Sequence, residues 1–175
     1  MLIQIEITTH CNYQCFYCAG RHMRQAHMPW SRFTEIMAQL PATAREVSLQ
    51  GEGEPLLHPR FWDMAQMVLD QGLAPYTITN GSHIDPERLA AHFPAVGISI
   101  DTLDAALAQT VGRFKLERVL ENLDALLGCM SADRIIIHTV YFGQPLSDLK
   151  TYLSTRGLTQ HLIQEIQPKT DYASK

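Results

Sequence analysis

Short runs of apolar and β-branched residues recur along the chain, and they predict β-strands. Residues 2–8 form the first run, in which polar and apolar side chains alternate with a period of two. Later runs predict further strands over residues 46–50, 75–79, 95–100, 134–142 and 162–166. Asn80 and Gly81 follow the third run as a turn signal, so that strand is expected to end there.

Between these runs, apolar residues recur three and four positions apart, which is the spacing of one face of an α-helix. The pattern predicts helices over residues 31–40, 59–71, 86–92, 116–127 and 146–155. Ser31 is the expected N-cap of the first helix, with Glu35 in its first turn. Gly72 is expected to end the second helix, and Pro86 to begin the third.

The regular alternation of strands and helices predicts parallel strand pairing with right-handed crossovers. Six such units fit in 175 residues, whereas a closed eight-fold barrel needs about 250 residues. We therefore predict an α/β fold, a partial (βα)6 open barrel with parallel strands, with a doubly wound open sheet as the second choice. No clear break divides the chain, so residues 1–175 are expected to form a single domain with a loose tail over 168–175.

Composition and charge limit the class of protein. Hydrophobic residues make up 46% and charged residues 18% of the chain, which is typical of a globular protein. The net charge of −4 speaks against a dominant nucleic-acid surface, because such a surface needs a basic patch. No apolar run approaches the roughly 20 residues of a membrane span, and the N-terminus has no signal-peptide pattern. We therefore expect a cytoplasmic protein with no membrane and no nucleic-acid partner.

Three of the four cysteines are crowded together near the N-terminus. Cys11, Cys15 and Cys18 have the spacing C-x3-C-x2-C, with Tyr17 directly before the last cysteine. Three thiolates on one short loop can hold three corners of an iron–sulfur cube and leave the fourth iron open to a substrate or cofactor. The remaining Cys129 lies at the end of a predicted helix, where a small buried apolar residue is the ordinary interpretation.

A tetrahedral zinc site is the alternative for these cysteines, because structural zinc is bound by Cys and His ligands. Such a site needs a fourth ligand, which would be His10, His22 or Cys129. Zinc sites usually combine two C-x2-C pairs, so a triplet spaced three and then two residues apart favours iron–sulfur binding.

Other polar motifs follow the remaining predicted strands, and in both parallel architectures ligands bind at the carboxyl ends of strands. The segment 51–55, Gly-Glu-Gly-Glu-Pro, follows the second strand, and Thr79-Asn80-Gly81 follows the third. Ser99 and Asp101 close the fourth strand, and His138 lies in the fifth. We therefore expect these residues and the cysteine loop to meet at one rim.

The cysteine triplet with its preceding tyrosine resembles the signature of the radical S-adenosylmethionine (radical SAM) superfamily. Residues 51–55 resemble the glycine-glycine-glutamate-proline segment of that family, in the variant with a Glu between the glycines. Residues 79–81 and 97–101 match the order of the family's later motifs, and the resemblance extends over residues 3–168. The ordered set of motifs on a βα repeat is highly specific.

The resemblance implies a 4Fe-4S cluster held by Cys11, Cys15 and Cys18, with the methionine part of SAM on the fourth iron. One electron from the reduced cluster would cleave a carbon–sulfur bond of SAM, and the 5′-deoxyadenosyl radical would abstract hydrogen from a substrate. An electron donor such as flavodoxin or ferredoxin is implied as a partner. The residues implied in SAM binding are Tyr17, Gly51, Gly53, Glu54, Ser99 and Asp101.

Each implied residue has a physical reason for its role. The 51–54 segment would offer carbonyl groups and the Glu54 carboxylate to the SAM ammonium, with glycines that allow close approach; a charge at the start of the next helix is the alternative role of Glu54. Tyr17 would stack beside the adenine. Ser99 and Asp101 are two residues apart on a strand, so they would point to one face and touch the ribose or the carboxylate. Arg113 lies where the family often places a cation for the SAM carboxylate, although its local sequence departs from the family's Arg-Gly pair.

The substrate is less well indicated than the cofactor. Residues 51–59 are most similar to radical SAM proteins that modify peptides and proteins, many of which carry a cysteine-rich C-terminal extension. No cysteine follows Cys129, so no further cluster is expected. The first expectation is a maturase or activase with a peptide or protein substrate. A small-molecule or nucleotide-like precursor is the second expectation, and a non-catalytic zinc or redox module is the third.

Overall fold

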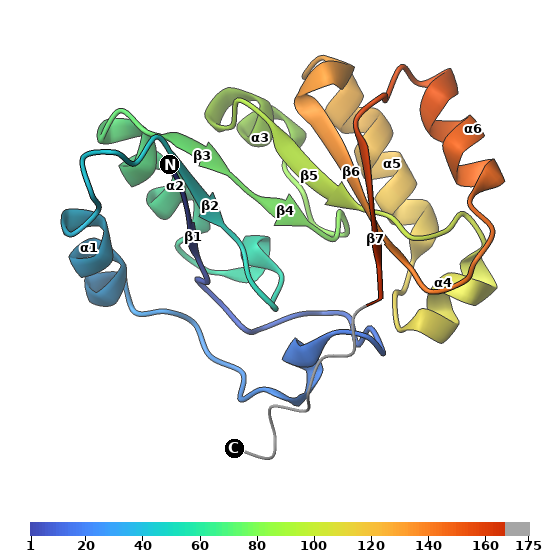
Figure 1. Cartoon of the computed structure of the whole chain (residues 1–175), viewed down its shortest axis with the longest axis horizontal. Coiled ribbons are helices and arrows are strands. Elements are labelled where there is room, and N and C mark those ends of the chain that lie inside the picture. Colours follow the sequence, from blue (N-terminus) through green and yellow to red (C-terminus); the bar gives the residue numbers. More distant parts are fainter. Residues whose placement is uncertain (167–175) are drawn as a thin grey trace.

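The computed structural model describes residues 1–166, which form two parallel β-sheets covered by helices (Figure 1). The tail over residues 168–175, which the sequence predicts to be loose, lies outside the described residues. The first sheet consists of β1 (Leu2–Ile5), β2 (Glu46–Leu49) and β3 (Ala74–Tyr76). The second sheet consists of β4 (Ile78–Thr79), β5 (Val96–Ser99), β6 (Ile135–Tyr141) and β7 (His161–Glu165).

The strands follow one another in space in the order of the sequence, β1-β2-β3 and then β4-β5-β6-β7. Every pairing between these strands is parallel. A doubly wound sheet reverses its strand order at a switch point, and no reversal occurs among the described strands. The predicted open, partial barrel of parallel strands is therefore confirmed, and the doubly wound sheet is excluded as its architecture.

The predicted strand over residues 75–79 is broken into β3 and β4 at Thr77. The Thr77 hydroxyl donates to the carbonyl of Leu49 in β2 at 2.8 Å, while the Thr77 carbonyl accepts from the N–H of Gly97 in β5 at 2.8 Å. Thr77 therefore connects the two sheets, although it belongs to neither ladder. The six predicted strands therefore correspond to seven observed strands, because the third predicted strand is divided into β3 and β4.

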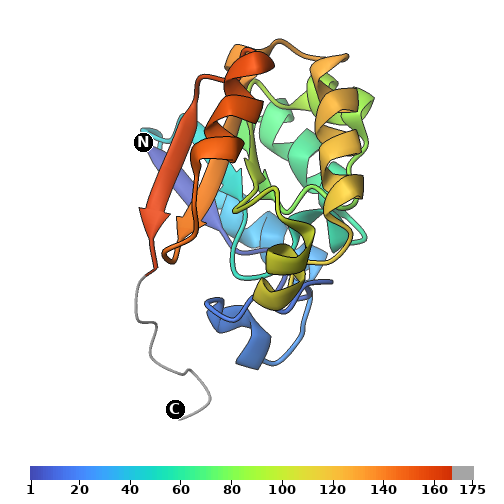
Figure 2. The same ribbon diagram turned by 90° about the vertical axis from the view of Figure 1, so that its right-hand side faces the viewer.

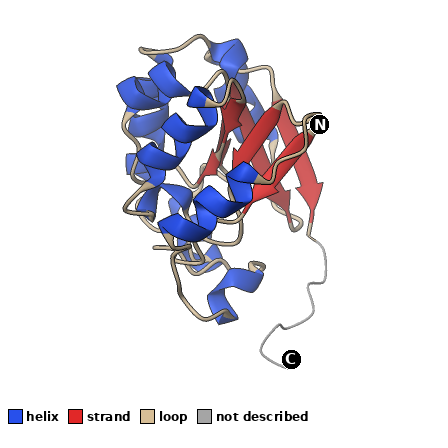
Figure 3. Ribbon diagram, turned by 90° about the vertical axis from the view of Figure 1, so that its left-hand side faces the viewer, coloured by secondary structure: helices blue, strands red, loops and turns tan. Residues whose placement is uncertain are grey.

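The helices lie on one side of the sheets and leave the other side uncovered by helix (Figures 2 and 3). They are α1 (Trp30–Ala38), α2 (Phe61–Asp70), α3 (Pro86–His92), α4 (Ala105–Val111), α5 (Leu116–Leu127) and α6 (Ser147–Thr155). Short 3₁₀ turns are η1 (Ala19–His22), η2 (Pro55–Leu57) and η3 (Ala132–Arg134). Within the described part of the chain, none of the helices is both long enough and apolar enough to cross a membrane.

Two expectations about helix ends are confirmed and one is wrong. Gly72 ends α2 with φ of +72°, a left-handed conformation that glycine adopts without strain, and Pro86 begins α3. Ser31, by contrast, is not the N-cap of α1, because the helix already begins at Trp30 after Pro29. Glu35 therefore lies beyond the first turn, where it pairs with Arg32 at 3.2 Å.

One apolar core lies between the helices and the sheets, and it includes residues of both sheets. Val47 of β2 and Ile98 of β5 are fully buried in it, together with Phe61 of α2. The Phe61 ring stacks on Phe93 with ring centroids 5.7 Å apart. Both sheets therefore contribute to the same core, and the single domain stays a prediction.

Candidate functional site

The three N-terminal cysteines lie on the loop after β1, at the carboxyl ends of the strands (Figure 1). The turn after α4 holds this loop, because the N–H of Gln14 donates to the Gly112 carbonyl at 2.9 Å and the N–H of Phe16 to the Val111 carbonyl at 3.0 Å. Gly112 has φ of +98°, and a Cβ there would come within 2.2 Å of the Gln14 carbonyl oxygen. Helix α4, which the sequence analysis did not predict, therefore positions the cysteines.

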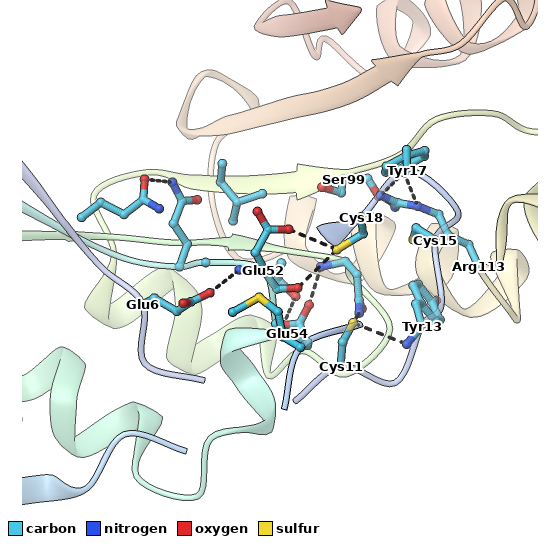
Figure 4. A pocket seen from close by; sticks show the side chains of 18 of the residues that line it. Glu6, Cys11, Tyr13, Cys15, Tyr17, Cys18, Glu52, Glu54, Ser99 and Arg113 are labelled. Atoms are coloured by element: carbon cyan, nitrogen blue, oxygen red, sulfur yellow. Dashed lines mark hydrogen bonds between the residues drawn. The ribbon is translucent and has the colours of Figure 1, made fainter. Parts of the chain in front are cut away.

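Cys11, Cys15 and Cys18 line one cavity of about 720 Å³ (Figure 4). Cys15 is buried, Cys18 is half-buried and Cys11 is exposed. Cys129 is also exposed, so its interpretation as a small buried residue is wrong. Although Cys11 is exposed as a residue, partial removal of its sulfur from water raises the pKa of the thiol. Burial raises the pKa of Cys18 to about 11, with help from a hydrogen bond to Glu52. A bound metal would lower the pKa of these thiols, since a thiol that coordinates a cation loses its proton.

The arrangement of the thiols distinguishes a cluster from a single ion. Within residues 1–166, no three His, Cys, Asp or Glu side chains are grouped so that they could hold one metal ion. His10, His22 and Cys129, which would supply the fourth zinc ligand, are not among the residues that line the cavity. In an iron–sulfur cube each thiolate binds a different iron, so the sulfur atoms do not need to converge on one point. Three thiols on one loop around an open cavity therefore suit a 4Fe-4S cluster better than zinc.

The 51–54 segment packs against the end of the first strand and its following loop. The N–H of Glu52 donates to Oε1 of Glu6 at 2.7 Å. A Cβ at Gly51 would come within 2.3 Å of the same Glu6 oxygen, and a Cβ at Gly53 would come within 2.4 Å of the Thr8 carbonyl oxygen. Both glycines are thus needed for packing within the protein.

The Glu54 carboxylate is 2% exposed and contributes to the cavity wall (Figure 4). Its Oε1 accepts from the Thr79 hydroxyl at 2.7 Å and from the Leu56 N–H at 3.2 Å, and its Oε2 accepts from the Asn80 N–H at 2.7 Å. The bond from Leu56 caps η2, so Glu54 also has the alternative role foreseen at the start of the next helix. Burial raises the pKa of this carboxyl group. A carboxylate has about four acceptor positions, so these bonds leave one on Oε2 for a further donor.

Asn80 joins the cysteine loop to the turn after β4. Its Nδ2 donates to Oδ1 of Asn12 at 2.9 Å and lies 3.9 Å from the Cys11 sulfur. Its Oδ1 accepts from the N–H of Ser82 at 2.9 Å and from the Ser82 hydroxyl at 2.6 Å. Asn80 therefore does more than form a turn, since it orders the chain beside the first cysteine.

Tyr17, Asp101 and Arg113 form a buried network at the other side of the loop. The Tyr17 hydroxyl donates to Oδ2 of Asp101, and Nε of Arg113 lies 3.0 Å from the same oxygen. Arg113 also donates to the Tyr17 oxygen at 3.0 Å and to the Ser99 carbonyl at 2.7 Å. Burial, with a smaller contribution from the Asp101 charge, raises the pKa of Tyr17 well above its usual value, so the phenol keeps its proton and can donate.

The structure brings all but one of the predicted site residues to the same cavity. The predicted residues that line it are Cys11, Cys15, Tyr17, Cys18, Gly51, Gly53, Glu54 and Ser99. Asp101 is not among the lining residues, because β5 ends at Ser99 and the alternation of sides along a strand no longer applies two residues later. Arg113 does line the cavity, despite the departure of its local sequence from the family pattern.

Several cavity residues were missed by the sequence analysis, namely Gln4, Glu6, Tyr13, Met23, Gln50, Ile78 and Gln164. Gln4 and Glu6 had a detectable signal, because they are the polar positions of the alternating first strand. Met23 follows η1 within the basic stretch of residues 21–24, whose arginines and histidine are exposed. His138 is half-buried in β6 and is not part of this cavity lining.

A family model described as the radical SAM superfamily matches residues 5–155 of the chain. The S-adenosylmethionine-dependent nucleotide dehydratase of Selenomonas ruminantium is 26% identical over 144 residues, covering 79% of this chain and 53% of that protein. The tungsten-containing aldehyde ferredoxin oxidoreductase cofactor-modifying protein of Pyrococcus furiosus is 26% identical over 188 residues, covering 96% of this chain and 52% of that protein. The chain thus spans about half the length of these curated relatives.

The fold is also found among solved structures. The crystal structure of Streptococcus suis SuiB bound to the precursor peptide SuiA superposes with a TM-score of 0.83. The superposition covers 98% of this chain and 40% of that chain, at 19% sequence identity. At this identity the likeness shows a shared fold, which agrees with the partial barrel described above.

Proposed function

The chain belongs to the radical SAM superfamily, and we propose that it is the catalytic core of an enzyme that uses a 4Fe-4S cluster and SAM on a small, nucleotide-like substrate. One observation carries this proposal: three thiols of one loop line the same cavity as a buried carboxylate and a tyrosine. When bound, the two cofactors supply one-electron cleavage of a SAM carbon–sulfur bond, which yields a 5′-deoxyadenosyl radical able to take a hydrogen atom from the substrate.

In this proposal the cluster is held by the thiolates of Cys11, Cys15 and Cys18. Their loop is fixed by the backbone bonds to residues 111 and 112, so the thiols are presented at the cavity before any cofactor binds. These three thiolates would hold three irons of the cluster, and SAM would bind the fourth.

The SAM-binding roles follow from the hydrogen-bonding capacity of the cavity wall. Glu54 has an acceptor position on Oε2 that suits the SAM ammonium, and its buried charge would be stabilised by that partner. Ser99 and the backbone of Gly51 and Gly53 also face the cavity. We propose that Asp101 acts indirectly, by holding Tyr17 and Arg113 in place.

The choice of a small substrate rests on the names of curated relatives, which include a nucleotide dehydratase and a cofactor-modifying protein. A peptide or protein substrate, the first expectation from residues 51–59, is the second candidate. SuiB, which is bound to a precursor peptide, favours that candidate only through its fold. An electron donor such as flavodoxin or ferredoxin is proposed as a partner, and the reduced thiols that the cluster needs favour the cytoplasm.

Anaerobic reconstitution tests the cofactor chemistry. We expect a brown protein that forms 5′-deoxyadenosine from SAM on reduction with dithionite. Replacing Cys11, Cys15 or Cys18 by Ala is expected to abolish this product, because each thiolate holds a separate iron. Cys129→Ala is the matched control, since this exposed cysteine lies outside the cavity and should leave iron content unchanged. Retained turnover in all three loop variants would contradict the assignment.

The substrate class is tested separately on the active protein. Each of the four ribonucleoside 5′-triphosphates is added, and 5′-deoxyadenosine is measured against the level formed without substrate. A rise with at least one nucleotide is expected, because substrate binding promotes productive SAM cleavage. If no nucleotide raises the product level, the nucleotide-like substrate is rejected while the cluster chemistry stands.

A further inference from the structure

A row of polar side chains crosses the face of the sheets that the helices leave uncovered. Gln4 of β1 pairs in register with Ser48 of β2, and Ser48 pairs with Tyr76 of β3. Their neighbours along β2, Val47 and Leu49, point to the opposite side, into the core. The row also adjoins the candidate cofactor site, because Gln4 lines the cavity.

Tyr76 extends the row across the break between the sheets. Its hydroxyl lies 2.9 Å from Nε2 of His138, which belongs to β6 and pairs in register with the cavity residue Ser99. The contact passes over Gly97 of β5. A Cβ at Gly97 would come within 2.8 Å of the Tyr76 oxygen and 2.9 Å of Cδ2 of His138. The missing side chain at Gly97 is therefore what allows the pair to form.

Two groups in the row have unused hydrogen-bonding capacity. The Ser48 hydroxyl is buried and has no hydrogen-bond partner among the described residues. Buried hydroxyls are almost always paired in native proteins, so the Ser48 hydroxyl leaves both a donor and an acceptor unused within this row. The side chain of Gln4 is exposed, and its Oε1 accepts a long bond of 3.4 Å from Nε2 of Gln50.

The row is neutral, and carboxylates flank it. Burial raises the pKa of Tyr76 to about 12 and lowers the pKa of His138, so both side chains are uncharged near neutral pH. Glu46 stands two residues before Ser48 on the same strand face, and Glu6 lines the adjoining cavity. No Lys or Arg occurs within the strands β1 to β7 of the described chain. Such a surface repels an anion and suits a neutral group with both donors and acceptors.

We propose that the Tyr76–His138 pair, with Ser48 and Gln4, forms a subsite that binds a neutral group carrying hydrogen-bond donors and acceptors, as the base of a nucleotide does. The inference rests on the proposed function, because it assigns the base of the proposed nucleotide-like substrate to this row beside the cavity. Phosphate groups of such a substrate would lie away from the row. Tyr76 and His138 are then specificity residues, which recognise the substrate and leave the bond-breaking chemistry to the cofactors.

The test measures binding to the reconstituted, SAM-loaded protein by calorimetry under anaerobic conditions. The probes are adenosine, guanosine, cytidine and uridine, followed by the 5′-triphosphate of the nucleoside that binds most tightly. Tyr76→Phe and His138→Gln are expected to weaken binding at least tenfold, by the same factor for the nucleoside and its triphosphate. Iron content, SAM affinity and substrate-free formation of 5′-deoxyadenosine should not change. Tyr152→Phe is the matched control, because the hydroxyl of this α6 residue also has no described partner but lies outside the row.

Ser48→Ala is a second test, which remains valid if Tyr76→Phe or His138→Gln fails to fold. It removes only a hydroxyl without a described partner, so its melting temperature should match that of the wild type while nucleoside binding weakens. The inference is overturned if no nucleoside binds the wild-type protein, or if Tyr76→Phe, His138→Gln and Ser48→Ala all bind as tightly as the wild type. Because 5′-deoxyadenosine formation without substrate is measured in the same samples, these outcomes are distinct from a failure of the cofactor chemistry.

Discussion

The carboxylate of Asp101 joins three separate parts of the chain at the residue scale. It accepts from the Tyr17 hydroxyl in the cysteine loop, pairs with Arg113 and accepts from the N–H of Val140 at 2.9 Å. The Asp101 side chain is 1% exposed and that of Arg113 is 14% exposed, so water replaces few of these contacts if one partner is lost. Asp101 therefore stabilises the site from outside the cavity.

Replacing Asp101 by Ala is expected to destabilise the protein by about 3 kcal/mol, because it leaves a buried guanidinium group without its carboxylate. The measurement is urea unfolding of the reconstituted protein under anaerobic conditions. Asp124→Ala provides the matched control, since it breaks the exposed pair with Arg156 at 2.7 Å and should cost less than about 1 kcal/mol. Equal losses in the two variants would show that the Asp101 network does not stabilise the site.

Helix α4 and the turn after it determine the position of the cysteine loop at the scale of elements. Asp104 caps the helix, with its Oδ1 accepting from the N–H groups of Ala106 and Leu107 at 2.8 and 3.0 Å. At the other end, Gly112 ends the helix in a left-handed conformation and receives the cysteine loop against its backbone. The loop thus depends on a segment about one hundred residues away in the sequence.

Gly112→Ala is expected to displace the cysteine loop, because the added methyl group would lie 2.2 Å from the Gln14 carbonyl oxygen. We expect iron and sulfide per chain to fall to less than half of the wild-type value after reconstitution. Gly143→Ala is the control: its φ of +104° imposes a similar backbone strain, but no atom lies within 4 Å of the new Cβ. The role of the contact is disproved if both variants retain the same amount of iron.

The whole molecule is a half-barrel of two sheets that share one apolar core. Residues of β2, β5 and β6 are buried together with those of the covering helices, so neither sheet has a complete core of its own. We therefore propose that the described residues unfold as one cooperative unit, in line with the single domain predicted from the sequence.

Unfolding monitored by two probes tests this proposal. Trp30 and Trp62, the two tryptophans of the chain, lie in α1 and α2, so their fluorescence reports on the N-terminal sheet and its helices. Far-ultraviolet circular dichroism reports on all helices and strands. In urea the two midpoints are expected to agree within error, because a shared core couples the sheets. An earlier fluorescence transition would mean that the two sheets unfold separately.

The sequence by itself determined the features that depend on neighbouring residues. Periodicity located six strand segments and five of the helices, since a buried face must repeat with the geometry of its own element. The parallel pairing followed from their alternation. Because the carboxyl ends of parallel strands meet at one edge, the cysteines, residues 51–54 and Ser99 were also correctly expected to lie together.

Tertiary structure decided whatever depends on contacts between distant segments. The break at Thr77, the contact of the α4 C-terminus with the cysteine loop and the position of Asp101 outside the cavity all involve partners in other elements, namely Leu49, Gln14 and Val140. The row through Ser48, Tyr76 and His138 exists only because the strands adopt one register. Local patterns specify which face of a strand is polar, whereas the hydrogen-bonded register and the packing of the helices specify which polar residues meet.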